Sequence, residues 1–417
     1  IHNLKFQGTW SVDTIKGFSG LSDYYFTSDK LEAYGNGNLL KGGLVYADRI
    51  TTVSRSYASE IRMPFYGEGL DGLLRARSKQ LSGIVNGIDY NVYNPKTDKD
   101  IAVNYSVEDA IKAKAANKTA LQKELGLEEN PDAFMLGIVS RLTDQKGLDL
   151  VECVLDQICA EDVQLVVLGT GEGKYQDMFT YYSRKYPERV SANIFYSEAL
   201  SHRIYASCDA FLMPSLFEPC GLSQLMSLRY GTLPIVRETG GLRDTVTPYN
   251  EVDGTGTGFS FTNYNAHEML AIIRYAKKTY FNDRKAWNEM VLRAMKQDFS
   301  WDASAREYEK LYDGLIEEEE RRKEAIRLQQ AREAAEAALK EAEKALELAK
   351  RAEEKAIRKF SGIEDEPEDE KAETAEAKAA EKAQEAAPEA EEAEEVLETP
   401  ETPEEASETA KETAVEE

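Results

Sequence analysis

Two hydrophobic periods alternate along residues 132–297. Apolar runs such as "AFMLGIVS" (133–140) and "VQLVVLGTG" (163–171) have the length of buried strands, whereas "KGLDLVECVLDQIC" (146–159) has helical spacing. Strands that are apolar at nearly every position are typical of a parallel sheet covered by helices on both faces. We therefore expect an α/β domain here, with ligands bound at the carboxyl ends of its strands.

The same pattern continues on both sides of these runs. It predicts further strands at 48–54, 82–90, 189–196, 209–215 and 232–238. It predicts further helices at 174–187, 202–208, 221–231, twice within 265–297, and at 301–316. Beyond these, Ala, Glu, Lys and Arg dominate and apolar residues recur at roughly helical spacing, which indicates a long solvated helix or a coiled coil. This extension could mediate self-association or solubility, but we favour the interpretation that it is only a solvating appendage. The last residues are rich in Pro, Glu, Ala and Thr, a composition typical of disorder.

These patterns divide the chain into six expected segments. The segments are the remainder of an N-terminal Rossmann-like domain (1–95), a crossover (96–131), a second Rossmann-like domain (132–297), a closing helix (298–316), a charged helix or coiled coil (317–360) and a disordered acidic tail (361–417).

The net charge of −25 is unevenly distributed. Residues 361–417 hold 23 acidic residues and 4 lysines, and residues 317–360 balance 12 acidic against 12 basic residues, which leaves −6 for residues 1–316. The acidic excess therefore belongs to the tail and says little about a substrate. Because no basic stripe appears, we expect no nucleic-acid partner.

The four cysteines show neither a C-x-x-C pair nor metal-ligand spacing, so free thiols in a reducing compartment are expected. No run of about 18 apolar residues and no signal peptide are found, so we expect a cytoplasmic protein without a membrane partner. The chain begins Ile-His-Asn without Met, which suggests a fragment.

The stretch "FEPCGLSQL" (217–225) connects a predicted strand to a predicted helix. At Gly221 the backbone can approach a ligand closely, and the first N–H groups of the helix are free. With the hydroxyl of Ser223 nearby, the turn could bind a phosphate. An ordinary turn with a surface glutamate, Glu218, explains the same residues equally well.

A second stretch, "SRLTDQKG" (140–147), favours the functional interpretation. Arg141 and Lys146 lie at the same predicted sheet edge, where they could neutralise a diphosphate. As mere surface charge they would be unfavourable at a helix start. Tyr196 could stack on a base, although a half-buried aromatic is the commoner outcome. The pair formed by Asp98 and Asp100 lies in a polar loop, and we interpret it as chance rather than as a metal site.

Two further glycine turns, "LGTGEG" (168–173) and "ETGGL" (238–242), are expected at the same edge. Together with "SRLTDQKG", "FEPCGLSQL" and "YGTLPIVRETGGLRDTV", they closely resemble the bacterial glycogen synthases and plant starch synthases, which form glycosyltransferase family 5 and have the GT-B fold. "IHNLKFQG", "LKGGLVYADRITTVS", "YGEGLDGLLRAR" and "GIVNGIDYNVYNP" agree, so the resemblance covers roughly residues 1–316. It implies two Rossmann-like domains, the first of them incomplete.

The resemblance also implies an activity and a site. The activity is transfer of glucose from ADP-glucose to the non-reducing end of an α-1,4-glucan, with retention and without a metal or other cofactor. The implied catalytic residues are Glu218, His2, Arg141 and Lys146. The implied substrate-binding residues are Asn86, Gln145, Gly171, Tyr196, Cys220, Gly221, Leu222 and Ser223.

Departures from the family leave alternatives. A glycine-rich loop that begins with lysine normally opens the N-terminal domain, and "KGGL" (41–44), inside a predicted helix, is not that loop. We therefore expect this chain alone to be inactive or poorly folded. The alternatives are another GT-B transferase that uses a UDP-sugar, a phosphorylase, and a catalytically inactive glucan-binding protein. Nothing marks a lysine that carries pyridoxal phosphate, and the presence of Arg141, Lys146 and Glu218 argues against lost catalysis.

Overall fold

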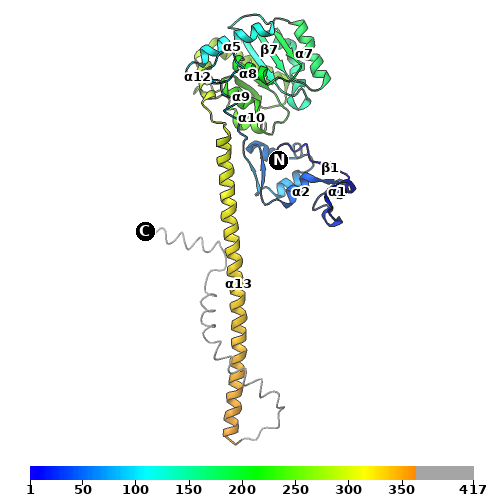
Figure 1. The fold of residues 1–417 in the computed structure, drawn as a ribbon, viewed down its shortest axis with the longest axis vertical. Coiled ribbons are helices and arrows are strands. Elements are labelled where there is room, and N and C mark those ends of the chain that lie inside the picture. The colour runs from blue at the N-terminus through cyan, green and yellow to red at the C-terminus, as the bar shows by residue number, and fades with distance from the viewer. Residues whose placement is uncertain (363–417) are drawn as a thin grey trace, which may run out of the picture. The chain divides into compact units, whose positions relative to one another are not determined.

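The computed structural model describes residues 1–362 of the chain (Figure 1). Its strands are β1 (Thr9–Trp10), β2 (Glu32–Ala33), β3 (Asn36–Asn38), β4 (Ile50–Thr52), β5 (Leu81–Gly83), β6 (Phe134–Val139), β7 (Val163–Leu168), β8 (Val190–Asn193), β9 (Ala210–Met213), β10 (Leu233–Arg237) and β11 (Phe259–Phe261). Its α-helices are α1 (Val12–Ser19), α2 (Leu39–Tyr46), α3 (Arg55–Glu60), α4 (Asp71–Ala76), α5 (Ala110–Leu125), α6 (Leu148–Cys159), α7 (Gly173–Lys185), α8 (Glu198–Ser207), α9 (Ser223–Arg229), α10 (Gly240–Thr245), α11 (Ala266–Asn282), α12 (Arg284–Met295) and α13 (Trp301–Phe360). Two short 3₁₀ helices are η1 (Asp23–Tyr25) and η2 (Asp144–Lys146).

The larger sheet has six strands in the order β11-β10-β9-β6-β7-β8, and all neighbouring pairs are parallel. From β6 the chain adds β7 and β8 on one side, then returns to add β9, β10 and β11 on the other. The strand order therefore reverses between β6 and β9. In open α/β sheets, the carboxyl ends of the strands at such a switch point form the ligand-binding crevice.

The strands of this sheet are buried on both faces. Leu136 of β6 and Val167 of β7 belong to the main hydrophobic core. Their neighbours Met135 and Val166 belong to a second cluster, which includes residues of α5 and α8. Because side chains alternate between the two faces of a strand, consecutive apolar residues supply both cores. This explains the continuous apolar runs in the sequence.

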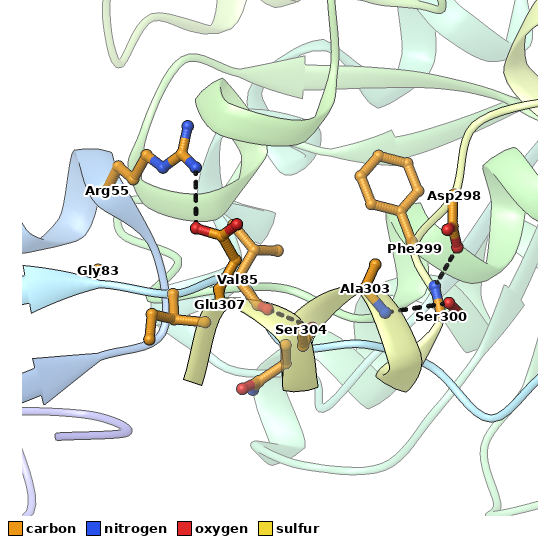
Figure 2. Close-up of a pocket in the computed structure, with 11 residues that line it drawn as sticks. Arg55, Gly83, Val85, Asp298, Phe299, Ser300, Ala303, Ser304 and Glu307 are labelled. Atoms are coloured by element: carbon orange, nitrogen blue, oxygen red, sulfur yellow. Dashed lines mark hydrogen bonds and ion pairs between the residues drawn. The ribbon is translucent and has the colours of Figure 1, made fainter. Parts of the chain in front are cut away.

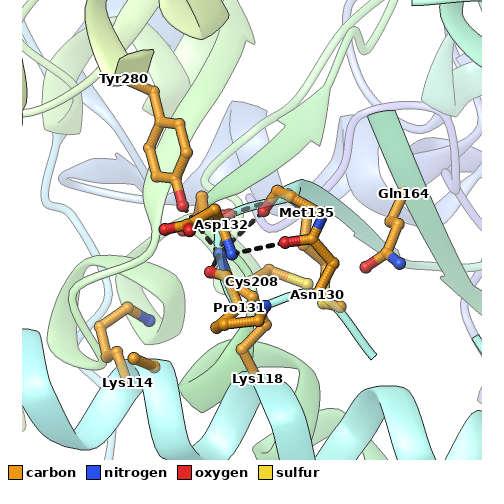
Figure 3. A network of polar contacts seen from close by, with 12 residues as sticks. Lys114, Lys118, Asn130, Pro131, Asp132, Met135, Gln164, Cys208 and Tyr280 are labelled. Atoms are coloured by element: carbon orange, nitrogen blue, oxygen red, sulfur yellow. Dashed lines mark hydrogen bonds and ion pairs between the residues drawn. The ribbon is translucent and has the colours of Figure 1, made fainter. Parts of the chain in front are cut away.

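A buried polar network fastens α5 to the sheet (Figure 3). Lys118 Nζ lies 2.6 Å from Asp209 Oδ2 and donates to the Tyr280 hydroxyl at 2.9 Å. The same Asp209 oxygen accepts from the Met135 backbone N–H at 2.8 Å. The side chains of Lys118 and Asp209 are only 4% and 10% exposed, so each charge depends on these partners.

The N-terminal part of the chain, residues 1–83, contains two small sheets. Strands β4 and β5 pair in parallel, and β1, β3 and β2 form an antiparallel sheet. The backbone nitrogen of Ile1 donates to the Thr51 carbonyl at 2.6 Å, so Ile1 lies beside β4. The stretch 41–44 lies inside α2, as predicted. Large exposed aromatic side chains in this part include Phe6, Trp10, Phe18, Tyr24, Tyr34 and Phe65.

One predicted strand is largely wrong. The apolar stretch 82–90 forms a strand only up to Gly83, at the end of β5. After it, the Ile88 N–H donates to the Phe299 carbonyl at 2.8 Å, and the Phe299 N–H donates to the Tyr90 hydroxyl at 2.8 Å. The segment therefore bonds to residues far along the chain instead of extending the β4–β5 pair.

The helix predicted at 301–316 and the charged helix predicted at 317–360 are a single helix, α13. The boundary between the two compact units of the chain nevertheless lies inside this helix, between Tyr308 and Glu309. The predicted disordered tail at 361–417 lies outside the described residues, apart from its first two. In the described part of the chain, no helix is long and apolar enough to cross a membrane.

Candidate functional site

Four turns follow neighbouring strands at the carboxyl edge of the six-stranded sheet. We call them the first turn (140–147, after β6), the second turn (168–173, after β7), the third turn (214–221, after β9) and the fourth turn (238–241, after β10). They contain the four motifs that the sequence places at this edge. Backbone hydrogen bonds connect them in a row.

The first and second turns are joined by two bonds. The Leu142 N–H donates to the Thr170 carbonyl at 2.8 Å, and the Glu172 N–H donates to the Leu142 carbonyl at 2.7 Å. This short parallel bridge extends the pairing of β6 and β7 beyond their ends. The positions of the two turns are therefore fixed by the sheet itself.

The third turn lies between the first and the fourth. The Leu216 N–H donates to the Gln145 carbonyl at 2.9 Å, and Gln145 Nε2 donates to the Phe217 carbonyl at 3.3 Å. On the other side, the Gly241 N–H donates to the Glu218 carbonyl at 3.0 Å. The main chain around Glu218 is thus held from both neighbouring turns.

Glycine at position 147 permits the close contact between the first and third turns. Its φ is +68°, and a Cβ atom there would lie 2.1 Å from the Pro214 carbonyl oxygen. A side chain would force the two turns apart and would also strain the backbone. The residue before it, Lys146, is brought against the third turn by this contact.

A carboxylate and an ammonium group meet where these turns join. Lys146 Nζ lies 2.6 Å from Glu218 Oε2, and the Ser215 hydroxyl donates to the same oxygen at 3.0 Å. The side chains of Lys146 and Glu218 are 16% and 7% exposed. Such a pair is poorly screened by water, so removal of either partner leaves an uncompensated charge.

Some other predicted residues of the four turns, and Tyr196 after β8, are exposed. Arg141 is exposed and forms no ion pair with any residue among 1–362. Tyr196, which follows the edge strand β8, is 85% exposed. Gly171 and Leu222 are exposed as well. The structure thus joins Lys146 to Glu218 and Gln145 to the turn that carries Glu218, whereas the side chains of Arg141 and Tyr196 form no hydrogen bond or ion pair within the described part of the chain.

The third turn leads into α9, which has seven residues and begins at Ser223. No side chain caps its first turn. The Ser223 hydroxyl donates to the Val139 carbonyl at 3.4 Å, at the end of β6, so it points toward the first turn. Cys220 is buried, and burial raises the pKa of its thiol to about 11, although a hydrogen bond from the Asn86 backbone acts in the opposite direction.

This contact places Asn86 beside the third turn. Asn86 also lines a cavity of about 180 Å³ between β5 and the start of α13, shown in Figure 2. There the Ser304 hydroxyl donates to the Val85 carbonyl at 2.7 Å, and Arg55 lies 3.8 Å from Glu307. The segment that carries Asn86 is therefore anchored on both sides.

His2 is exposed in the N-terminal part. Its neighbour Asn3 lines a second cavity, of about 240 Å³, together with Leu216 and Phe217 of the third turn. The N-terminal stretch and the third turn thus face a common space, and Tyr66 lines it as well. No contact between His2 and Glu218 is formed.

Asp98 and Asp100 form a group with His202, and one potential ligand atom from each lies within 4.8 Å of the others. Asp98 is buried and its oxygens already have donors. Asp98 Oδ2 lies 2.7 Å from His202 Nδ1 and accepts from the Tyr230 hydroxyl, while Oδ1 accepts from the Asp100 N–H. These hydrogen bonds lower the pKa of Asp98 against the opposing effect of burial. The interpretation that the pair holds no metal stays a prediction.

Residues that the sequence did not reveal also shape the site. Ser215 bonds to the Glu218 carboxylate, and Arg237, only 6% exposed, donates from Nε to the Ser215 carbonyl at 2.8 Å and from Nη2 to the Leu216 carbonyl. A signal was available for Arg237, because a charged residue at the carboxyl end of an apolar strand requires a buried partner. Nothing local pointed to Glu60, which reaches the fourth turn from α3.

Comparisons with known proteins show which family the sequence resembles. Residues 1–76 match the model of the starch synthase catalytic domain, and residues 119–291 match that of glycosyl transferases group 1. Glycogen synthase of Lachnospira eligens is 69% identical over 315 residues, and that of Lachnoclostridium phytofermentans is 64% identical over 315 residues. Each alignment covers 76% of this chain and 66% of the relative, so the chain spans slightly less than two thirds of their length.

A solved structure shows the same fold. The catalytic domain of starch synthase IV from Arabidopsis thaliana, bound to ADP and acarbose, matches with a TM-score of 0.71 and 35% identity. The match covers 75% of this chain and 65% of that one. The chain therefore has the GT-B fold of these glycosyltransferases, with Rossmann-like parallel sheets of which the first is incomplete.

Within that class the assignment is narrower. The chain belongs to the glycogen synthase family, glycosyltransferase family 5.

Proposed function

We propose that the protein transfers glucose from ADP-glucose to the non-reducing end of an α-1,4-glucan, with retention at the anomeric carbon. The observation that carries this proposal is the buried contact of Lys146 with Glu218, at the sheet edge where folds of this kind bind nucleotides. Membership of the glycogen synthase family supports the identity of donor and acceptor. Neither a metal nor another cofactor is part of the proposal.

Two cations would stabilise the departing diphosphate. As the bond to the sugar breaks, negative charge grows on the phosphate oxygens, and preorganised charges aimed at this position are usually the largest catalytic contribution. Lys146 is held in place by the packed first turn, and Arg141 at the other end of that turn is free to bind a phosphate. Each such donor is worth about 3–4 kcal/mol of barrier.

The carboxylate of Glu218 would face the transferred sugar. The transition state of glycosyl transfer resembles an oxocarbenium ion, whose positive charge a nearby carboxylate stabilises. Without a donor, Lys146 neutralises Glu218. We expect the incoming diphosphate to compete for the ammonium group, so that Glu218 becomes available to the sugar.

The remaining predicted residues would bind the donor around this centre. Tyr196, with its exposed ring, would stack on adenine, and His2 would approach the glucose from the N-terminal part. Closure of the two parts around the donor would bring His2 near. The other proposed donor contacts are Asn86, Gln145, Gly171, Cys220, Gly221, Leu222 and Ser223.

A donor assay tests the proposal. The full-length protein would be given ADP-glucose or UDP-glucose with a glycogen primer, and released nucleotide and incorporated glucose would be measured. We expect both products with ADP-glucose and neither at a comparable rate with UDP-glucose. Activity with UDP-glucose alone would indicate a different GT-B transferase. Retention of glycogen without nucleotide release would indicate a non-catalytic glucan-binding protein.

Two finer expectations accompany this function. The protein would work in the cytoplasm, and residues 317–360 would mediate self-association. Neither of them affects the donor assay.

A further inference from the structure

Helices α3 and α10 exchange carboxylate contacts. The first turn of each helix donates hydrogen bonds to a carboxylate of the other helix. Glu60, at the end of α3, accepts from the Gly240 N–H at 2.9 Å and from the Thr239 hydroxyl at 3.1 Å. Asp244 of α10 accepts from the Ser56 N–H at 2.9 Å and from the Ser56 hydroxyl. Free N–H groups and the helix dipole both favour a carboxylate at these positions. The two contacts therefore stabilise the same packing reciprocally.

This exchange joins distant parts of the chain. Helix α3 follows β4 of the N-terminal part, whereas α10 continues the fourth turn of the six-stranded sheet. Glu60 and Gly240 are 180 residues apart. The contact is therefore made by the tertiary fold, and it fixes the fourth turn from the side of the N-terminal part.

The fourth turn in turn supports the main chain of Glu218. The Gly241 N–H donates to the Glu218 carbonyl at 3.0 Å. Gly240 has a φ of +45°, and a Cβ atom there would lie 2.0 Å from the same carbonyl oxygen. With so little space between the two turns, a displacement of the fourth turn moves the backbone of Glu218.

A second connection runs parallel to the first. Arg237 Nη2 donates to the Tyr66 hydroxyl of the N-terminal part at 3.4 Å. The same guanidinium donates to the carbonyls of Ser215 and Leu216 in the third turn. The N-terminal part therefore reaches the backbone on both sides of Glu218, once through Glu60 and once through Tyr66.

The surroundings of Glu60 supply the hydrogen-bond donors that a partly buried carboxylate needs. The residue is half-buried, and burial raises its pKa, while the Gly240 N–H and the Thr239 hydroxyl act against that shift. Arg237 also attracts the carboxylate, and Asp244 repels it. A carboxylate placed where desolvation penalises it needs these donors to stay charged.

We propose that Glu60 is a positioning residue for glucosyl transfer, which holds the fourth turn and through it the main chain of Glu218. This inference rests on the proposed function. Lys146 and Arg141, which would bind the diphosphate, lie on the first turn, and no bond connects that turn with Glu60. Loss of the Glu60 contact should therefore lower turnover and leave donor binding nearly unchanged.

Kinetics of the full-length protein test this separation. We expect Glu60→Ala to lower kcat on the order of tenfold with the KM for ADP-glucose within about twofold, a pattern that marks an interaction needed in the transition state. Glu60→Gln, whose amide oxygen can still accept from Gly240, should lose less. Glu32→Gln is the matched control, because Glu32 accepts the Gly35 N–H inside its own hairpin. It should behave as wild type.

Hydrogen exchange gives a readout that is independent of activity. In Glu60→Ala, peptides covering 215–222 and 237–245 should exchange faster than in wild type, and in Glu32→Gln they should not. Thr239→Val removes a hydroxyl that donates to Glu60, so it should also lower kcat and speed exchange in these peptides. If Glu60→Ala fails to fold, Thr239→Val tests the positioning role instead.

The outcomes separate this inference from the proposed function. No transfer by wild type, with faster exchange in Glu60→Ala, would defeat the proposed function while the contact itself stands. An active wild type with unchanged kcat in Glu60→Ala and Thr239→Val would overturn the positioning role, whatever the exchange rates. Equal losses of donor binding and turnover would also overturn it.

Discussion

The Lys146–Glu218 pair owes its position to backbone bonds as much as to its own attraction. Gln145, next to Lys146, bonds through its carbonyl to Leu216, and Ser215 holds the Glu218 carboxylate. The charges are thereby aimed before any ligand arrives, which is the condition under which fixed charges lower a barrier most. Predictions at this scale concern single side chains.

Substitution of either member of the pair should abolish most of the turnover. We expect Lys146→Ala and Glu218→Gln each to lower kcat at least about a hundredfold, because each removes a preorganised charge. Nucleotide release on a glycogen primer measures the effect, and circular dichroism checks the fold. Lys185→Ala is the control, since Lys185 pairs with Asp156 of α6 and with none of the four turns. Near-normal rates in both site variants would refute the roles assigned to them.

The cysteines should differ sharply in their reactivity toward an alkylating reagent. The pKa of Cys220 is raised to about 11 by burial, so at pH 8 only about a thousandth of it is thiolate, the reactive form. We expect mass spectrometry to find exposed Cys153 modified first, and labelling of Cys220 to accelerate as the pH rises toward 11. Equal labelling of Cys220 and Cys153 at pH 8 would contradict the burial of the third turn.

Only some of the residues that form the site could be recognised from the sequence. Arg141, Lys146 and Glu218 lie in turns that follow apolar runs, where a parallel sheet collects its ligand-binding groups, and the resemblance to glycosyltransferase family 5 suggested their roles. Glu60 could not be found in this way, because no local pattern encodes a contact across 180 residues. Ser215 lies only three residues from Glu218, but no motif marks its hydroxyl as a donor to that carboxylate.

At the scale of elements, whether a predicted strand formed depended on which residues its backbone bonds to. Apolar runs at 133–140 and 163–171 gave strands because flanking strands satisfied their backbones. The stretch 82–90 left the strand after Gly83, since its backbone bonds to residues near 299. The continuous helix α13 was divided in the prediction because composition changes at 317, whereas helical hydrogen bonds do not depend on such a change.

The contact between the first and third turns can be tested through a glycine. Gly147→Ala should lower the free energy of unfolding by several kcal/mol and impair turnover, because it combines a left-handed φ with a collision at the Pro214 carbonyl. Gly126→Ala is a matched control: its φ is also +68°, but nothing lies within 4 Å of the added Cβ atom. It should cost only about 1 kcal/mol, the strain alone.

Chemical denaturation measures both variants. Equal losses of stability in Gly147→Ala and Gly126→Ala would show that backbone strain, rather than contact between the turns, requires glycine at position 147.

At the scale of the whole molecule, residues 1–308 form one unit, and the described residues from 309 onward belong to another. The first contains every residue assigned to the site. In the second, ion pairs such as Arg321–Glu317 and Arg351–Glu347 connect neighbouring turns of α13 itself. They stabilise the helix only modestly, but they do so without any partner.

Removal of residues 317–417 should therefore spare catalysis. We expect the shortened full-length protein to keep the kcat and KM of the parent within about twofold, since the site lies in the first unit. Sedimentation velocity of the two proteins, run beside the kinetic assay, tests whether 317–360 supports self-association. A large loss of turnover on truncation would assign the segment a role in the site.

The central claim is that the turns at the carboxyl edge form the donor diphosphate site. A crystal structure of the full-length protein with bound ADP tests it most directly. We expect phosphate oxygens about 3 Å from Lys146 Nζ and within reach of Arg141, with the Glu218 carboxylate beside the terminal phosphate. ADP bound away from the first and third turns, or with both cations facing elsewhere, would contradict this assignment.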